Sequence, residues 1–551
     1  MSSPVLQIEK LSLALPGGAD RPFAIENLSL EVAAGETLCV VGESGSGKSM
    51  TALATIGLLP SSVRPAGGSI RLAGRNLLGL SETEMQDVRG REIGMIFQEP
   101  MTSLNPVMRV SDQIVETFEA HGALDRRGRR ERTLQLIEEV GLPDPVSIAR
   151  AYPHELSGGQ RQRVMIAMAL AMEPKLIIAD EPTTALDVTT QAQILKLLDA
   201  LRKKHGTAVL FITHDFGVVA EIADRVAVLQ HGLCVETGRT ADLLHNPQHD
   251  YTKRLLAAVP SLDPPPPKDL VGAREAFVVQ GLSKTYKGRG FFRRGREVAA
   301  AADVSFSIKR GETLGLVGES GSGKSTVGRC VLRLIEPDGG TIRVGDVAIE
   351  KLSQAQFRPL RKRIQMVFQD PFASLNPRRT VGRIIAEGPI AQGVSKADAL
   401  AKARNLLDLV GLRAEVADRY PHEFSGGQRQ RIGIARALAL EPDVLVADEP
   451  VSALDVSVQA QILALMQDLQ KRLGLAILFV THDLRVAAQM CDRIAVMQKG
   501  RIVELQPTAA LFAAPQHAYT RALLAAVPGA AGLSPLPARG ERSSDAPASA
   551  G

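Results

Sequence analysis

Short, strongly apolar segments alternate along the chain with longer amphipathic ones. Positions from Leu6 to Leu13 alternate roughly between apolar and polar, which predicts a half-buried antiparallel strand. The runs Thr37 to Val41, Lys175 to Ala179 and Ala208 to Thr213 are almost continuously apolar, which is typical of strands covered on both faces in a parallel sheet. Helical patterns such as Val188 to Lys204 separate these runs. The pattern therefore predicts an α/β fold.

The same pattern occurs twice. The stretch GESGSGKS at Gly42 to Ser49 recurs at Gly318 to Ser325, and the LSGGQRQR around Ser157 is matched by the FSGGQRQR around Ser425. A repeat of this length indicates a duplicated domain rather than a solenoid. In the first copy, Val110 to Tyr152 is rich in charge and in helix formers, which predicts a mostly helical insert.

Four consecutive prolines, Pro264 to Pro267, lie between the two copies and favour a stiff polyproline II segment. We therefore predict a first domain over residues 1–262, a linker over 263–273 and a second domain over 274–528. The tail 529–551 is rich in Ala, Gly, Pro and Ser, which predicts disorder.

Composition and charge restrict the location of the chain. The 551 residues hold 65 Lys and Arg against 60 Asp and Glu, a net charge of +5, which is a weak indication of nucleic-acid binding. No uncharged apolar run reaches the ~18 residues needed to span a bilayer, and the first residues lack the apolar core of a signal peptide. We expect a cytosolic or peripheral protein. Its four scattered cysteines are expected to be buried, reduced and structural: Cys39, Cys234, Cys330 and Cys491.

GESGSGKS follows an apolar run and precedes a helical one, which is the pattern of a phosphate-binding P-loop. The glycines let backbone N–H groups point at phosphate oxygens, and the helix N-terminus adds partial positive charge. Lys48 is predicted to reach the β- and γ-phosphates and Ser49 to ligate Mg²⁺. The predicted ATP-binding residues are Gly42, Glu43, Ser44, Gly45, Ser46, Gly47, Lys48 and Ser49, and in the second copy Gly318, Glu319, Ser320, Gly321, Ser322, Gly323, Lys324, Ser325 and Thr326.

Two adjacent carboxylates end a buried strand in each copy, at the edge where α/β sheets bind ligands. The first, Asp180 or Asp448, is predicted to hold Mg²⁺, and the second, Glu181 or Glu449, to polarise the water that attacks the γ-phosphate. His214 and His482 end the next apolar run, in FITHD and FVTHD. We assign both histidines as γ-phosphate sensors that stabilise the transition state.

These motifs together resemble the nucleotide-binding domains of ATP-binding cassette (ABC) proteins, over nearly the whole of both copies. The set comprises the P-loop, FQ-P, LSGGQ, apolar-DE, TALD or SALD, and TH. The resemblance implies two tandem ABC-type P-loop NTPase domains, each with a RecA-like parallel-sheet core, an antiparallel β subdomain and a helical subdomain. It also implies that the copies pair head to tail, so that each ATP lies between one P-loop and the signature of the other copy.

The resemblance assigns further site residues. Gln98 and Gln369 match the mobile glutamine, which meets both the metal and the attacking water, and Asp187 and Asp455 lie at the seam between the copies. Each signature faces the ATP of the other copy; these residues are Ser157, Gly158, Gly159 and Gln160 in the first and Ser425, Gly426, Gly427 and Gln428 in the second. The metal ligands are then Ser49, Gln98 and Asp180 in one site and Ser325, Gln369 and Asp448 in the other. Both sites are expected to hydrolyse ATP.

One position departs from the family pattern. An aromatic residue usually lies under the adenine, and Tyr286 fits this role in the second copy. Leu15 takes the equivalent place in the first copy, with Phe23 as a possible substitute. The first site is therefore expected to bind adenine more weakly or less selectively.

The end of each copy resembles the C-terminal motif of ATPases that serve dipeptide, oligopeptide, nickel and glutathione importers, through NPQHDYTKRLLAAVP from Asn246 and PQHAYTRALLAAVP from Pro515. The resemblance implies two permeases and an extracytoplasmic solute-binding protein as partners, no nucleic acid, and a peripheral position on the inner face of the cell membrane. Many relatives carry a cysteine cluster after this motif; here none follows, so no iron–sulfur cluster is expected. The alternatives are an importer ATPase for nickel or another non-peptide solute, and a soluble tandem ATPase acting on ribosomes or nucleic acid.

The densest basic segment is KGRGFFRRGR, from Lys287 to Arg296. It is interpreted as a solvated loop between strands, with contact to lipid head groups or a membrane subunit as the alternative.

Overall fold

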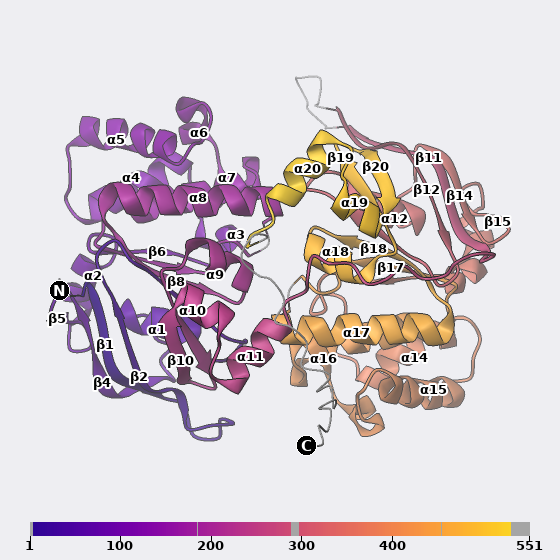
Figure 1. Cartoon of the computed structure of the whole chain (residues 1–551), viewed down its shortest axis with the longest axis horizontal. Helices are drawn as coiled ribbons and strands as arrows, with labels where there is room; N and C mark the ends of the chain where they lie inside the picture. Colours follow the sequence, from indigo (N-terminus) through magenta and orange to yellow (C-terminus); the bar gives the residue numbers. More distant parts are fainter. Residues whose placement is uncertain (1–3, 185, 288–296, 453, 530–551) are drawn as a thin grey trace, which may run out of the picture.

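The computed structural model describes residues 4–184, 186–287, 297–452 and 454–529. It shows two halves of the same architecture lying side by side in opposite orientations (Figure 1). The helical layer of the first half lies at the top of that view, and that of the second half lies at the bottom. The head-to-tail pairing implied by the resemblance therefore occurs within one chain.

An antiparallel sheet opens the first half, with the strand order β2-β1-β4-β5. Its strands are β1 (Leu6–Ala14), β2 (Phe23–Val32), β4 (Arg64–Leu72) and β5 (Arg75–Asn76). Ile8 pairs with Leu30 on one side and with Ile70 on the other. The alternating pattern at the start of the chain thus correctly predicted a half-buried antiparallel strand.

The central sheet of this half has the order β10-β9-β3-β8-β7-β6, parallel except for β10. Its strands are β3 (Thr37–Val41), β6 (Ile93–Ile96), β7 (Leu176–Asp180), β8 (Ala208–Thr213), β9 (Arg225–Gln230) and β10 (Leu233–Arg239). Along β3, Cys39 and Val41 pack into one hydrophobic cluster while Leu38 and Val40 pack into another. Because successive side chains point to opposite faces, a strand buried on both faces reads as a continuous apolar run.

Helices cover both faces of this sheet. They are α1 (Lys48–Thr55), α2 (Glu82–Val88), α3 (Pro100–Ser103), α4 (Val110–Ala120), α5 (Arg126–Glu139), α6 (Pro145–Arg150), α7 (Gly158–Leu170), α8 (Val188–His205), α9 (Phe216–Ile222), α10 (Thr240–His245) and α11 (Asp250–Ala257). The insert predicted from Val110 onward is helical as expected, because it forms α4, α5 and α6.

The second half repeats this plan. Its antiparallel sheet has the order β12-β11-β14-β15, and its central sheet β16-β17-β18-β13-β19-β20. The strands are β11 (Glu275–Lys287), β12 (Glu297–Lys309), β13 (Thr313–Val317), β14 (Gly339–Val344), β15 (Val347–Ala348), β16 (Ile364–Val367), β17 (Val444–Asp448), β18 (Ala476–Thr481), β19 (Arg493–Gln498) and β20 (Arg501–Pro507). The α-helices are α12 (Lys324–Val331), α13 (Gln354–Phe357), α14 (Val381–Ala391), α15 (Lys396–Leu409), α16 (Gly426–Leu438), α17 (Val456–Leu473), α18 (Leu484–Met490), α19 (Thr508–Ala513) and α20 (Ala518–Ala525).

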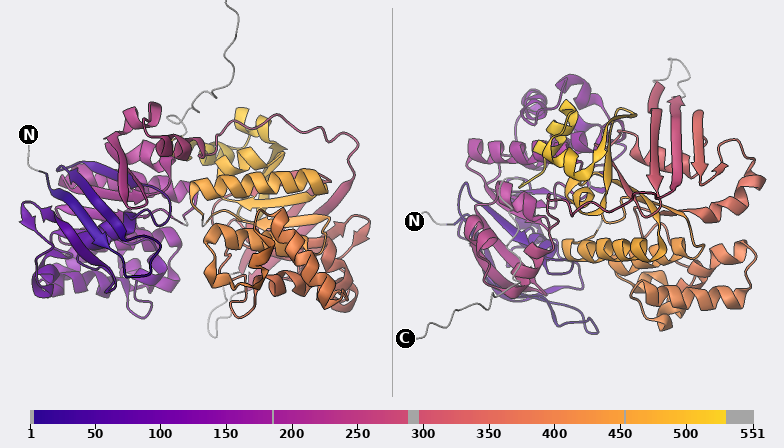
Figure 2. Two further views of the ribbon diagram at one scale, coloured as in Figure 1. Left: turned by 90° about the horizontal axis from the view of Figure 1, so that it is seen from below. Right: turned by 45° about the vertical axis from the view of Figure 1, so that its right-hand side comes forward.

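The segment between the halves is docked on the second half. Residues 258–274, all of them described, form no helix or strand, and the chain runs across the second half (Figure 2). Lys268 Nζ donates to Gln470 Oε1 at 2.7 Å and to Asp492 Oδ2 at 2.9 Å. Gln489 Nε2 donates to the carbonyls of Ser261 and Asp263, each at 2.9 Å. The proposed linker 263–273 is thus held by side chains at several points.

The cysteine prediction is wrong at one position. Cys39, Cys330 and Cys491 are buried, but Cys234 is only partly buried. Cys234 lies on β10, the edge strand of its sheet, where one side of the strand lacks a neighbour. Burial raises the pKa of the Cys330 thiol to about 11, which favours the protonated thiol.

Two predictions concern residues outside the part that the structure describes. The basic segment lies there from residue 288 to 296, and the predicted disordered tail lies there from residue 530. Among the described residues, none of the helices combines the length and the apolar character needed to cross a bilayer.

Candidate functional site

The two P-loops join β3 to α1 and β13 to α12 with the same geometry. Gly47 has a φ of 106°, and a Cβ there would lie 2.9 Å from the carbonyl oxygen of Ala24, so only glycine fits before the helix. Lys48 begins α1, and its Nζ donates to the carbonyls of Gly42 at 2.7 Å and Glu43 at 2.9 Å. Lys324 makes the equivalent contacts at the same distances. Each ammonium group is therefore buried within its own loop.

Burial lowers the pKa of Lys48, and the carboxylates of Glu181 and Asp455 oppose this effect. Asp455 belongs to the second half, so a carboxylate of one half affects the pKa of a lysine in the other half. The hydroxyls of Ser46 and Ser322 are buried and have no hydrogen-bond partner among the described residues. Unpaired buried donors in a glycine loop suit a phosphate ligand, because phosphate oxygens accept hydrogen bonds.

A hydroxyl and a carboxylate meet beside each P-loop. Ser49 Oγ donates to Asp180 Oδ1 at 3.1 Å, and Ser325 Oγ donates to Asp448 Oδ1 at 3.2 Å. Burial raises the pKa of Asp180. The described residues include no cluster of three His, Cys, Asp or Glu side chains suited to a metal ion. One hydroxyl and one carboxylate fit Mg²⁺ when phosphate oxygens and water complete the shell, which is the usual arrangement for this ion.

The adjacent glutamates are the most constrained residues of the sites. Glu181 and Glu449 have φ angles of 47° and 46°, which costs about 1–3 kcal/mol for a residue with a side chain. Gln98 Nε2 donates to Glu181 Oε2 at 2.9 Å, and His214 Nδ1 lies 3.2 Å from Oε1. Gln369 and His482 contact Glu449 in the same way, at 2.8 and 3.2 Å. The structure thus brings together the glutamate, glutamine and histidine predicted for each site.

The surroundings set the protonation of these groups. Burial by itself raises the pKa of Glu181, but the hydrogen bond and charge of His214 outweigh it and hold that pKa below its usual value. The same contact raises the pKa of His214, although burial opposes it. Thr184 Oγ1 also donates to Glu181 Oε2, at 3.0 Å. Thr184 lies in the turn after β7 and begins the TALD motif, to which the sequence pattern assigned no contact with Glu181.

Both SGGQ segments begin helices through a capping box. Gln160 N donates to Ser157 Oγ at 3.3 Å, and Ser157 N donates to Gln160 Oε1 at 2.9 Å. A Cβ on Gly159 would lie 2.5 Å from Thr190 Cγ2, and one on Gly427 would lie 2.3 Å from Val458 Cγ1. Glycine here lets α7 and α16 approach α8 and α17 closely.

One cavity of about 1150 Å³ spans the two halves. Its lining includes Ser44 and Gly45 from the first P-loop together with Ser425, Gly426 and Gly427 from the second signature. The second P-loop also contributes, from Gly323 to Thr326, as do Glu181 and Glu449. Among the described residues that line it, none comes from the first signature. The cross-half pairing implied by the resemblance is therefore visible for the first P-loop.

The seam aspartates differ between the halves. Asp455 Oδ1 accepts from Ser44 N of the first P-loop at 3.0 Å. Asp187 instead caps its own helix, because its Oδ1 accepts from Thr190 N at 3.0 Å. Two hydroxyls complete the seam: Ser457 Oγ donates to Glu43, and Thr189 Oγ1 donates to Glu319. Both predicted aspartates lie at the contact between the halves, but in the part of the chain that the structure describes, only Asp455 bonds across it.

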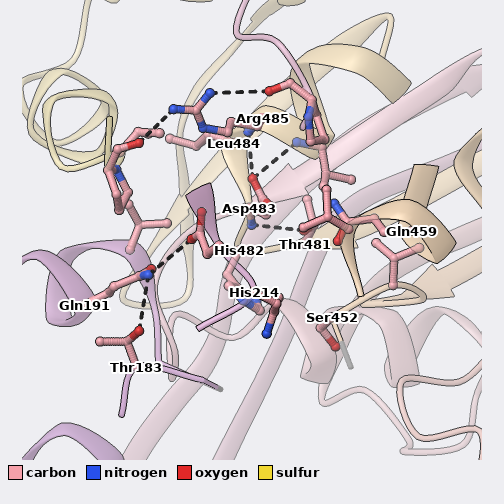
Figure 3. A pocket seen from close by; sticks show the side chains of 18 of the residues that line it. Thr183, Gln191, His214, Ser452, Gln459, Thr481, His482, Asp483, Leu484 and Arg485 are labelled. Carbon is pink, nitrogen blue, oxygen red and sulfur yellow. Dashed lines mark hydrogen bonds between the residues drawn. The ribbon is translucent and has the colours of Figure 1, made fainter. Parts of the chain in front are cut away.

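A smaller pocket of about 140 Å³ lies between the two histidine segments (Figure 3). Arg485, only 8 % exposed, donates to the carbonyl of Pro528 at 2.7 Å and to that of Pro260 at 3.4 Å. The matching residue of the first half is Gly217, where a Cβ would lie 2.8 Å from the Pro528 carbonyl. One arginine thus ties together the C-terminal ends of both halves. A comparison of the two copies could have drawn attention to Arg485, because the equivalent position of the first copy is a glycine, Gly217.

The positions predicted to stack against adenine also differ between the two sites. Tyr286 is 42 % exposed on β11, where it pairs with Val298 of β12. Leu15 is partly buried in the first core, and its N–H donates to Pro22 at 2.9 Å. Phe23, the possible substitute, begins β2 and pairs with Ala14. The guanidinium of Arg21 donates to the carbonyl of Gly45, a contact that the sequence pattern did not reveal.

Replacing Leu15 with Tyr is expected to tighten ATP binding at the first site. Stacking of a base on an aromatic ring contributes ~1–3 kcal/mol, so the affinity should rise at least about fivefold. The measurement is equilibrium ATP binding in a Lys324→Ala background, which confines binding to the first site. The matched control is Tyr286→Leu in a Lys48→Ala background, which should weaken binding at the second site. Unchanged affinity in Leu15→Tyr would refute the proposed position of the adenine.

The chain is similar to several known proteins. The family model described as "ABC transporter" matches residues 25–184 and 301–452. That described as "Oligopeptide/dipeptide transporter, C-terminal region" matches residues 235–296 and 503–547. The chain is 49% identical over 580 residues to the glutathione import ATP-binding protein GsiA of Shigella dysenteriae serotype 1, covering 98% of this chain and 92% of that protein. The Escherichia coli K12 protein of the same name matches with the same identity and coverage. Among solved structures, the dimeric post-hydrolysis state of an ATP-binding cassette bound to ADP and Pi matches with 30% identity and a TM-score of 0.38, over 42% of this chain and 98% of that one.

Proposed function

We propose that this chain, which belongs to the ABC transporter family, powers the import of peptides or related small solutes of the dipeptide, oligopeptide and glutathione class. As a family member it is an ATPase whose hydrolysis is coupled to transport. The observation that carries the proposal is the match of both C-terminal regions to an oligopeptide and dipeptide transporter model, together with relatives named as glutathione importers. Its partners are two permeases and an extracytoplasmic solute-binding protein, and its position is peripheral, on the inner face of the cell membrane.

Two ATP molecules are bound with Mg²⁺, each between a P-loop and the opposite signature. Lys48 and the loop N–H groups hold the phosphates of one, and Lys324 those of the other. Ser49, Gln98 and Asp180 in one site, and Ser325, Gln369 and Asp448 in the other, would hold Mg²⁺, which would supply positive charge to offset that of the phosphates. No iron–sulfur cluster takes part.

Hydrolysis is carried out by the residues gathered at each strand end. Glu181 accepts a proton from the attacking water, and His214 then donates a hydrogen bond to the γ-phosphate. Both Gln98 and His214 contact Glu181 in the described structure, so ATP binding requires them to turn toward the phosphate. Ser425, Gly426 and Gly427 close the site through the N-terminus of α16. The second site works in the same way with Glu449 and His482.

Reconstitution tests the proposal. The tagged chain is purified from detergent-solubilised membranes, the copurifying membrane proteins are identified, and the complex is placed in proteoliposomes with its solute-binding protein. We expect ATP-dependent uptake of glutathione or a dipeptide. Uptake of Ni²⁺ alone would replace the peptide class with a metal. Copurification with ribosomes or DNA, without membrane proteins, would refute the importer.

A further inference from the structure

The C-terminal motif places one tyrosine against each P-loop. Tyr251, 4 % exposed, lies on α11, and its hydroxyl accepts a hydrogen bond from Glu43 N at 3.2 Å. Tyr519 on α20 accepts from Glu319 N at 3.1 Å. Besides burial, the carboxylate of the same glutamate raises the pKa of each phenol. The contact recurs in both halves, where the surrounding sequences are similar.

Hydrogen bonds fix the starts of α11 and α20, and therefore the position of the tyrosine on each helix. Glu236 on β10 accepts from Gln248 N at 2.7 Å and from His249 N at 3.1 Å. His249 Nδ1 then accepts from Tyr251 N at 3.2 Å, which caps α11. Glu504 holds Gln516 and His517 in the same way before α20, at 2.8 and 3.0 Å. The residues of the PQH motif thus position the tyrosine.

The glutamate that each tyrosine contacts also crosses the seam. Glu43 accepts from the Ser457 hydroxyl at the start of α17, and Glu319 accepts from the Thr189 hydroxyl at the start of α8. Figure 1 shows α11 beside α17 and α20 near α8. Each C-terminal helix, one P-loop and the opposite half therefore form one hydrogen-bonded chain. Burial raises the pKa of both tyrosines to about 12, so their hydroxyls keep the proton at neutral pH.

We infer that Tyr251 and Tyr519 are positioning residues that hold Glu43 and Glu319 against the hydroxyls of the opposite half, so that the C-terminal helices set the ATP concentration at which the halves close. The P-loop glutamates, predicted as ATP contacts, then act on the opposite half instead. Neither tyrosine touches the reacting atoms. The inference rests on the proposed closure of the two halves around ATP.

A double-mutant cycle in the full chain tests the inference. Closure is measured as ATP retained after rapid gel filtration, in a Glu181→Gln and Glu449→Gln background. Tyr251→Phe keeps the ring and removes the hydroxyl, and Ser457→Ala removes the partner. Each change should raise the half-saturating ATP concentration about fivefold, the net effect of one hydrogen bond. The double variant should show no more than the larger single effect, because both changes break the same chain.

The matched control uses the other site of the same molecule. Tyr251→Phe combined with Thr189→Ala should give effects that multiply, since Thr189 belongs to the chain of Tyr519. In the unsubstituted glutamate background, Tyr251→Phe should raise KM and leave kcat unchanged, whereas a merely structural role would lower kcat. If Tyr251→Phe fails to fold, Glu43→Gln replaces it in the cycle.

The outcomes separate the inference from the proposed function. Multiplicative effects of Tyr251→Phe and Ser457→Ala, or no effect of Tyr251→Phe, would overturn the inference alone. Failure of the parent background to retain ATP would instead refute the proposed closure.

Discussion

Replacement of Glu181 and Glu449 by glutamine together is expected to lower ATP turnover by about 10²–10⁴-fold while ATP binding persists, because this is the usual contribution of a general base. Glutamine keeps the shape of the side chain and can still bond Thr184, but it cannot accept a proton from water. Turnover is measured as phosphate release and binding as retained nucleotide. Each single change should silence its own site, so a single variant with full turnover would show that its glutamate is not the base.

The retained nucleotide is the second part of this expectation. A chain that binds ATP without hydrolysing it should stay closed, and two ATP molecules should remain with each chain after gel filtration. The control is Glu221→Gln, a change of the same kind on α9, outside the two sites. This control should hydrolyse ATP at the parent rate and retain no nucleotide.

Replacement of Lys48 by alanine is expected to abolish nucleotide binding at one site and to leave the other intact. Among the described residues, the buried ammonium of Lys48 donates hydrogen bonds only to its own loop, and Lys324 makes the same contacts in a separate loop. A hydrogen bond to a charged group contributes about 1.5–3 kcal/mol, so the loss of two to the phosphates should weaken that site ~10²-fold or more. Calorimetric titration with a non-hydrolysable ATP analogue should give one bound nucleotide in place of two.

Lys175→Ala serves as the control, because Lys175 is exposed and pairs with Glu92 on the same half. It should bind two nucleotides with parent affinity. Loss of both nucleotides in Lys48→Ala would mean that the P-loops are not independent, and that binding at one depends on closure at the other.

The local elements could be predicted because their causes are local. Continuous apolar runs indicated buried strands, and β3 and β8 have the predicted bounds. The helix over Val188 to Lys204 extends one residue further, to His205. The P-loop depends on neighbours within a few residues, so its letters alone identified it, whereas the Asp-Glu pair was interpreted through the P-loop upstream of it. The misjudged exposure of Cys234 reflects an edge strand, which the order of strands in the sheet decides.

Contacts between distant residues could not be read from the letters. The left-handed backbone of Glu181 and Glu449, the placement of Arg485 against both chain ends, and the contacts of Tyr251 and Tyr519 all depend on packing. So does the difference between Asp187 and Asp455, whose motifs are almost the same.

The sequence by itself determined that this protein has two phosphate-binding halves of one α/β design, since backbone geometry and strand burial follow from short patterns. Only the tertiary structure decided how those halves meet: which carboxylate bonds across the seam, and which helix supports each P-loop. The physical reason is that a hydrogen bond between segments far apart in the chain depends on where the whole fold places both partners.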